Sequence, residues 1–269
     1  IWEYPGLSWM FRQVLREYKY IKIQEVISLK FEKTEVFNIE GALRGMRNPL
    51  ASWGKSDSQK AYWNGIWNTQ DDSIRDYISD FGVNYDIGDA DMHLAQRLIK
   101  GGAEHRKFLR QIFVSVDITA PLYWWKEFDT YKVSVTANST STMHKLASTP
   151  ITLDCFETDD YDPNLSCAED PELEIDDLNN ISTFTEDLIM VLENLRQKYL
   201  ATKDMRYWKE LVRWLPESWL QTRTVTMDYE NLRSMYFQRK GHKLTEWRDA
   251  FIPWVESLPY AKELLCYDP

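Results

Sequence analysis

The chain has 269 residues, of which 43% are hydrophobic, so it can form one large domain or two small ones around a buried core. Its formal net charge of −10 argues against binding long nucleic acid, because a polyanion needs a basic surface, whereas a mononucleotide needs only a few local cations. No apolar run is long enough to span a membrane, and the first residues lack a signal-peptide pattern. We therefore expect a soluble, cytoplasmic protein without a membrane partner.

Cysteine and histidine spacing indicates neither a disulfide framework nor a metal site. The three cysteines, Cys155, Cys167 and Cys266, are an odd number without a CxxC spacing, and no two histidines stand at metal-ligand spacing. The twelve Trp and fifteen Tyr fit an aromatic-rich interior. They also fit flat surfaces for a planar ligand or a subunit contact, for which the Trp124-Trp125 pair would be suited.

The first half of the chain predicts strands and short helices in alternation. Apolar alternation predicts a strand over residues 20–37, with one face formed by Ile21, Ile23, Ile27, Leu29 and Phe31. The further predicted elements are, in order, a short helix ending at Asn48-Pro49, a loop with short helical pieces over 50–87, a helix capped by Asp89 or Asp91 and ended by Gly101-Gly102, a short helix over Glu104–Arg110, a buried strand over 112–120, a helix opened by Pro121, and a strand or extended loop over 131–138.

The last third of the sequence is predicted to be helical. Residues 154–180 form an acidic run that fits a solvated loop or a lid over a site. The predicted helices run from a capping box at Thr183 and Glu186 to about Leu200, over 203–214, from Asp228 to Lys240, and from Thr245 onward with breaks at Pro253 and Pro259. Together these elements predict one α+β domain with a mixed α/β arrangement and a helical C-terminal third.

Two segments have side chains suited to anionic ligands. Residues Gly102–Lys107 place cations at the start of a predicted helix, where backbone amides suit a phosphate, although their spacing alone favours a solvated face. Residues Thr136–Lys145 gather hydroxyls, an amide and a lysine that can hold a polar or anionic ligand, or form an ordinary polar loop. The sequence has none of the GxGxxG, GxxxxGK[ST], HExxH and GxSxG motifs.

A third group consists of Arg223, Arg239 and His242. Arg239 stands near the end of a predicted helix, where a cation also favours the helix dipole, so a structural role competes with ligand binding. The planar guanidinium makes arginine the preferred bidentate partner of a phosphate.

In their order along the chain, these segments resemble the flavin-dependent thymidylate synthase (ThyX) family over roughly residues 35–250. The pieces that carry the resemblance are GALRGMR at 41–47, HLAQRLIKGGAEH at 93–105, IFVSVDITAP at 112–121, Leu215-Pro216 followed by Thr222-Arg223, and Arg239 with His242. The resemblance divides the chain into an N-terminal extension and first strand (1–34) and a ThyX-like domain (35–265) containing the acidic loop.

The resemblance also assigns roles to individual positions. Counting on from Ala120-Pro121, the family's Arg-His-Arg signature falls on Thr130, Tyr131 and Lys132, so one cation survives in kind. The family's loop Glu falls on Asn138, its Ser on Thr140 or Ser139, and its phosphate-binding Arg on Thr142. The resulting sets are His105, Lys107, Thr130, Tyr131, Lys132 and His242 for the cofactor, Asn138, Ser139, Ser141, Thr142 and Arg223 for the substrate, and Arg239 with Thr140 for catalysis.

The family binds FAD between subunits of a homotetramer and methylates dUMP with methylenetetrahydrofolate and NADPH. The resemblance therefore implies FAD-dependent transfer of a one-carbon unit to a pyrimidine deoxynucleotide, with a pyrimidine mononucleotide and further copies of the chain as partners. The alternative is a non-catalytic flavin- or nucleotide-binding homologue that acts in assembly or regulation. The replaced signature favours this alternative, whereas His105, Arg223 and Arg239 argue against it.

Overall fold

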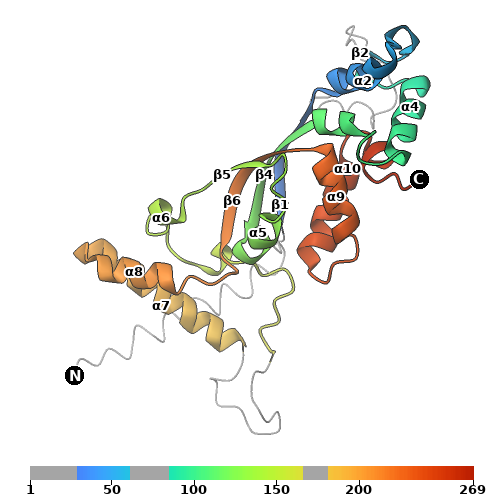
Figure 1. Cartoon of the computed structure of the whole chain (residues 1–269). Helices are drawn as coiled ribbons and strands as arrows, with labels where there is room; N and C mark the ends of the chain where they lie inside the picture. Colours follow the sequence, from blue (N-terminus) through green and yellow to red (C-terminus); the bar gives the residue numbers. More distant parts are fainter. Residues whose placement is uncertain (1–28, 61–84, 166–180) are drawn as a thin grey trace, which may run out of the picture.

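A computed structural model describes residues 29–60, 85–165 and 181–269 (Figure 1). At its centre lies a four-stranded antiparallel sheet with the strand order β1-β4-β6-β5. The strands are β1 (Lys30–Phe37), β4 (Phe113–Pro121), β5 (Thr136–Ser139) and β6 (Leu220–Asp228). A small second sheet pairs β2 (Gln59–Lys60) with β3 (Tyr85–Asp86).

Helices lie beside the sheet and beyond both of its ends (Figure 1). The α-helices are α2 (Ile39–Arg47), α4 (Asp89–Lys100), α5 (Leu122–Phe128), α6 (Thr142–Lys145), α7 (Ile181–Thr202), α8 (Met205–Arg213), α9 (Tyr229–Arg239) and α10 (Ile252–Ser257). Short 3-10 helices cover Asn48–Leu50, Trp53–Lys55, Lys107–Gln111 and Leu153–Cys155, and π-helical turns cover Glu246–Phe251 and Ala261–Leu265. Figure 1 shows α2 and α4 at one end of the sheet and α7 and α8 at the other.

Strand alternation gives the sheet one apolar and one polar face. Val114, Val116 and Ile118 of β4 stand opposite Met227, Val225 and Arg223 of β6 on the core face. The other face carries Ser115, Asp117 and Thr119 of β4 opposite three threonines of β6. The sheet therefore buries one side only, and the α+β fold predicted from the sequence is confirmed.

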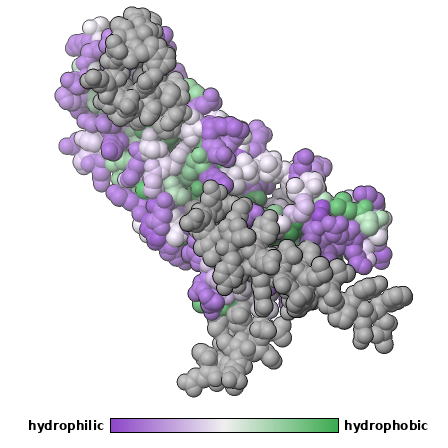
Figure 2. Space-filling model, turned by 180° about the vertical axis from the view of Figure 1, so that it is seen from behind, coloured by the Kyte–Doolittle hydropathy of each residue, from purple (hydrophilic) through white to green (hydrophobic). Residues whose placement is uncertain are grey.

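The buried residues form two clusters. The larger contains the apolar sheet face and the aromatic side chains of α5 and of the π-helical turn at 246–251. The smaller lies between α7, α8 and the segment around Ile151 and Phe156. Figure 2 shows hydrophobic residues among hydrophilic ones at the end of the molecule where α7 and α8 lie.

The first strand confirms part of its sequence prediction. Leu29 and Val36 are buried and Phe31 packs against the core, whereas Ile21, Ile23 and Ile27 lie outside the described residues. A bulge between Glu32 and Glu35, with Lys33 at φ 52°, shifts the register and returns Val36 to the core face.

Several local predictions were wrong in detail. Neither Asp89 nor Asp91 caps α4: the carboxylate of Asp57 accepts hydrogen bonds from the Ala90 and Asp91 amides, and Asp91 itself is buried. The helix predicted over Glu104–Arg110 is a 3-10 helix over Lys107–Gln111. Thr183, the predicted cap, lies inside α7, which covers Ile181–Thr202. The amides of Ile181 and Ser182 in the first turn of α7 donate to backbone carbonyls of residues 163–165.

The C-terminal part differs in two further ways. Pro253 does not break a helix but lies in the first turn of α10, where its missing amide costs nothing, and a π-helical turn precedes it. Strand β6, the central strand between β4 and β5, was not predicted at all.

Candidate functional site

Helix α5 and its C-terminal residue Asp129 contact Arg223, Arg239 and His242 of the predicted site through two opposite faces. Residues four apart on a helix are rotated by only about 40° from each other, whereas residues two apart lie on opposite sides. Tyr123 and Glu127 therefore face the π-helical turn at 246–251, and Trp125 and Asp129 face strand β6. The intervening Trp124 and Phe128 are buried in the core and anchor the helix.

Arg239, at the end of α9, lies against the first of these faces. Its Nη1 pairs with Glu127 Oε2 at 2.9 Å, and its Nε donates to the Tyr131 hydroxyl at 2.8 Å. The guanidinium stacks on the Trp247 ring at 4.7 Å, and only 16% of the side chain is exposed. This arginine is thus held by a carboxylate, a phenol and an indole together.

Glu127 is shared by two further groups. Its Oε2 accepts a hydrogen bond from Trp247 Nε1 at 3.0 Å and lies 3.6 Å from His242 Nε2. The other ring nitrogen of His242 accepts from the Leu244 amide at 3.2 Å, which makes Nε2 the nitrogen available to Glu127. Trp247 belongs to the π-helical turn, a rare geometry that is frequent at functional sites.

Arg223 of β6 repeats this arrangement on the other face of α5. Its Nη1 pairs with Asp129 Oδ1 at 2.8 Å, its Nε donates to Gln221 Oε1 at 3.0 Å, and its guanidinium lies 4.1 Å from the Trp125 ring centre. The side chain of Arg223 is 16% exposed, but that of Asp129 is 53% exposed. Asp129 is therefore the partner of Arg223 that another anion can replace most easily.

Strand β5 brings part of the predicted substrate set beside Arg223. Ser139 pairs with Arg223 in the strand register, and the Thr140 amide donates to the Thr222 carbonyl at 2.9 Å. Gln221 Nε2 binds the Thr140 carbonyl at 3.0 Å and the Thr142 hydroxyl at 3.4 Å. The structure thus places Ser139, Thr140 and Thr142 around one end of β6, with Arg223.

Other predicted side chains have local structural partners. The Thr130 hydroxyl donates to the Glu127 carbonyl at 2.7 Å, at the end of α5. The Ser141 hydroxyl caps α6 by accepting from the His144 amide at 3.3 Å. Asn138 is exposed on the polar face of the sheet, opposite Thr224.

The first turn of α9 binds the two segments, around Arg106 and around Tyr131, that contain most of the predicted cofactor residues. Arg106 forms a two-pronged ion pair with Glu230, and Asn231 Nδ2 binds the carbonyls of Tyr131 and Val133. The side chains of His105, Lys107 and Lys132 in these segments are exposed. Lys107 pairs with Glu104 at 3.5 Å, and the His105 ring lies against Gly101.

The Tyr123 hydroxyl contacts two carboxyl groups, those of the buried Glu246 and of the partly exposed Glu157. Glu246 is 2% exposed, and its Oε2 has no hydrogen-bond partner among the described residues. Burial raises the pKa of Glu246 and also that of Glu157, where the charges of Asp159 and Asp160 add to the effect. One hydroxyl can donate to only one carboxylate, so the geometry favours a proton on the other carboxyl.

Sequence reasoning missed Glu127, Asp129, Trp125 and Trp247, which hold the two arginines. The spacing of Trp125 and Asp129 was visible in the sequence, but their partners lie far along the chain.

Within the described ranges, no group of acidic, histidine or cysteine side chains could hold a metal ion, and no helix is long and apolar enough to cross a membrane.

Two solved structures of ThyX from Helicobacter pylori, each containing FAD and dUMP, resemble this chain. One superposes with a TM-score of 0.55 at 15% identity, over 88% of this chain and 96% of that chain. The other gives 0.54 at 15% identity, over 89% and 98%. This chain has the fold of the flavin-dependent thymidylate synthases. No protein-family profile and no curated protein sequence matches it, so the ThyX resemblance stands at the level of the fold.

Proposed function

We propose that the protein catalyses FAD-dependent transfer of a one-carbon unit to a pyrimidine deoxynucleotide, dUMP or a related nucleotide. The observation that carries this proposal is the placement of Arg223 and Arg239 on opposite faces of α5, each stacked on an indole and each 16% exposed. A fold shared with structures that contain FAD and dUMP supports the same conclusion. The arrangement supplies two oriented cations for a phosphorylated pyrimidine.

The substrate phosphate is assigned to Arg223 and the neighbouring hydroxyls. Asp129 is more than half exposed, so a phosphate oxygen can replace its carboxylate on Arg223 with little rearrangement. The hydroxyls and amides around it come from Asn138, Ser139, Ser141 and Thr142. In this proposal Thr140 supplies a hydroxyl beside the reacting base.

Arg239 is assigned to the pyrimidine carbonyl on which negative charge develops. Glu127, Tyr131 and Trp247 fix its guanidinium, so no reorganisation is needed when that charge appears. Tyr131 also orients the arginine through its hydroxyl, and His242 lies on the same carboxylate.

The side chains at the first turn of α9 fit the diphosphate of FAD in charge. Lys107 and Lys132 are exposed cations there, the exposed His105 ring lies on the same segment as Lys107, and Thr130 and Tyr131 add hydroxyls beside Lys132. Bound flavin supplies hydride transfer, with NADPH and methylenetetrahydrofolate as co-substrates. A homotetramer is part of this proposal.

The second candidate is a non-catalytic flavin- or nucleotide-binding protein that acts in assembly or regulation. The ion pairs of Arg223 with Asp129 and of Arg239 with Glu127 favour it, because neither guanidinium is free of a carboxylate. At the signature triplet, Lys132 is the one cation in place of two arginines and a histidine.

A single-turnover reaction separates the candidates. The photoreduced flavoprotein is mixed under anaerobic conditions with dUMP and methylenetetrahydrofolate, and the nucleotide product is identified by mass spectrometry. We expect dTMP or another one-carbon product, lost in Arg239→Ala and retained in the control Arg206→Ala, whose exposed side chain pairs with Asp204 on α8. Bound flavin and nucleotide without any product would support the non-catalytic candidate, and unchanged turnover in Arg239→Ala would contradict the site assignment.

A further inference from the structure

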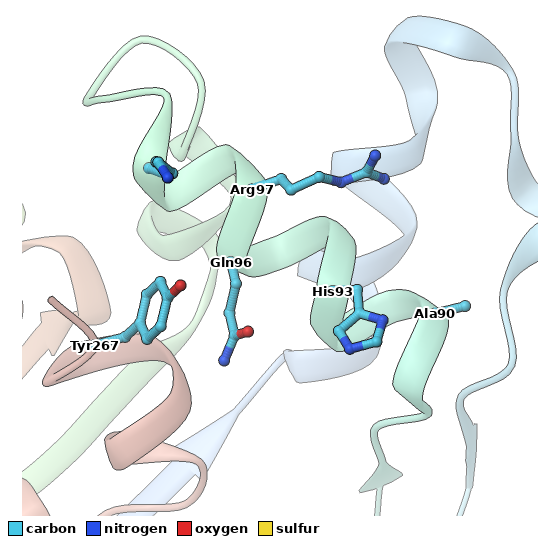
Figure 3. Close-up of a pocket in the computed structure, with 6 residues that line it drawn as sticks. Ala90, His93, Gln96, Arg97 and Tyr267 are labelled. Carbon is cyan, nitrogen blue, oxygen red and sulfur yellow. The ribbon is translucent and has the colours of Figure 1, made fainter. Parts of the chain in front are cut away.

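A groove runs along the outer face of α4, away from α5. Its lining residues are Ala90, His93, Gln96, Arg97, Lys100 and Tyr267, and its volume is about 630 Å³ (Figure 3). This lies within the range of small-molecule sites, roughly 300–1,000 Å³. Figure 3 shows Gln96 of α4 and Tyr267 of the C-terminal segment facing the same space. None of these residues belongs to the ThyX-like site proposed above.

The groove is basic in an acidic protein. His93, Arg97 and Lys100 repeat at helical spacing over about 10 Å of one helix face, and no acidic residue lines the groove. The whole chain has a net charge of −10. A local excess of cations therefore has to be explained at this position.

The ion pairs of the fold do not account for these cations. Most arginines in the described ranges are held by a carboxylate, as Arg106 is by Glu230 and Arg47 by Asp91. No ion pair within those ranges involves His93, Arg97 or Lys100. The helix dipole favours cations in the last turn, which covers Arg97 and Lys100 but not His93 in the second turn.

The C-terminal segment that carries Tyr267 is held in place by a buried arginine. Arg233, which is 6% exposed, donates from Nη1 to the Tyr267 carbonyl at 2.6 Å and to the Leu265 carbonyl at 2.7 Å. This buried guanidinium ties the C-terminal segment to α9 and holds the base of the Tyr267 side chain in place. The groove thus combines a cationic helix face, an amide from Gln96 and an aromatic ring on an anchored segment.

We propose that this groove binds a small phosphate-bearing ligand with a planar ring, of the nucleoside phosphate class. The phosphates lie along Arg97 and Lys100, with the His93 ring beside them, and the planar ring of the ligand lies between Tyr267 and Gln96. This site is separate from the FAD and dUMP assignments, which use the residues around α5 and the first turn of α9.

Isothermal titration of the whole chain with ADP, inorganic pyrophosphate and adenosine tests the proposal. We expect ADP to bind more tightly than pyrophosphate and adenosine to bind most weakly of the three. High salt should weaken the binding of ADP and of pyrophosphate. Arg97→Gln/Lys100→Gln should weaken ADP binding at least about tenfold, which corresponds to about 1.4 kcal/mol. The control Lys209→Gln/Arg213→Gln on α8 removes the same charge from exposed positions and should leave binding unchanged.

Three results would overturn the proposal. The first is no ADP binding by the wild-type chain, and the second is equal ADP affinity in the groove variant and its control. The third is loss of ADP binding in Lys132→Ala with no loss in the groove variant, which would place ADP at the residues assigned to the FAD diphosphate. A chain that retains no flavin but binds ADP through Arg97 and Lys100 would refute the proposed function alone. Equal affinities for ADP and pyrophosphate would show that the planar ring adds nothing to binding, and would contradict a nucleoside phosphate as the ligand.

Discussion

The ion pair between Arg47 and Asp91 gives the sharpest prediction about stability. Asp91 is fully buried, and Arg47 is 5% exposed, with 2.5 Å between Arg47 Nε and Asp91 Oδ1. The Ser56 and Ser58 hydroxyls donate to Asp91 Oδ2 at 2.6 and 2.5 Å. The carboxylate thereby joins α2, α4 and the segment at 56–58, and Arg47 belongs to the segment that resembles the ThyX family.

Asp91→Ala leaves the Arg47 guanidinium buried without its carboxylate. Removing one partner of a buried ion pair costs about 3–5 kcal/mol, a large part of a stability of roughly 5–15 kcal/mol. Arg47→Met should cost a similar amount, because it leaves the carboxylate without its cation. In the double variant Arg47→Met/Asp91→Ala no buried charge remains, so its cost should be clearly less than the sum of the two single losses.

Urea unfolding followed by tryptophan fluorescence measures all three variants against wild type. We expect unchanged slopes and a coupling free energy of at least about 1.5 kcal/mol between the two positions. Additive losses, or a loss below about 1 kcal/mol in Asp91→Ala, would refute the reasoning.

The same pair predicts a response to acid. Burial opposes ionisation of Asp91, but hydrogen bonds from Ser56, Ser58 and Arg47 outweigh it and hold the pKa of Asp91 below its usual value. Its stabilisation is therefore fully present above the unfolded-state pKa, about 3.9, and is lost as the pH falls through the folded-state value. Asp91→Asn removes the titrating group, so the variant should lose less unfolding free energy than wild type over this acid range. The same dependence of unfolding free energy on pH in wild type and variant over the acid range would contradict this prediction.

Three further predictions concern the core and the helix caps. Burial raises the pKa of Glu246, so its protonated form stabilises the fold at low pH. This contribution is lost as the pH rises from the unfolded-state pKa, about 4.3, through the folded-state pKa. Glu246→Gln should therefore gain unfolding free energy relative to wild type over that pH range, and parallel pH profiles in urea unfolding would contradict this. Trp124→Ala should cost about 3–5 kcal/mol in unfolding free energy, because the ring is fully buried, whereas Trp214→Ala, 62% exposed, should cost under about 0.5 kcal/mol; equal losses would refute the assigned core. Asp228→Ala removes the cap on the Asn231 amide at 2.8 Å and should lower the thermal midpoint by an amount equivalent to about 1 kcal/mol, while Asp228→Asn keeps the cap and should lose less.

Local patterns in the sequence were sufficient for the elements that depend on near neighbours. The predicted strand over 112–120 is β4 at Phe113–Pro121, and Asp228 caps α9 as its position indicated. Both signals are local, since strand alternation and helix capping are completed within a few residues.

Long-range contacts explain what the sequence did not predict. Strand β6 places Gln221 and Arg223 on its core-facing side, so its apolar alternation is limited to Val225 and Met227. The Asp57 cap of α4 comes from another segment of the chain. Among the described aromatic residues Trp124 and Trp125 are both buried in the core, whereas Trp53 and Trp214 are exposed.

The partners of the candidate site residues follow the same rule. The sequence singled out Arg223 and Arg239 but not the carboxylates of Asp129 and Glu127, which reach them only after α5 has packed against the sheet and α9. The positions assigned from the ThyX resemblance stay predictions until a ligand is measured.

Retention of flavin tests the central claim most directly. The purified chain is incubated with FAD and dialysed, and its visible absorption spectrum is compared with that of Lys132→Ala and of the control Lys209→Ala on α8. We predict flavin bands that remain with the wild-type chain and the control and are weakened in Lys132→Ala. A colourless protein after dialysis would contradict the proposed FAD-dependent function.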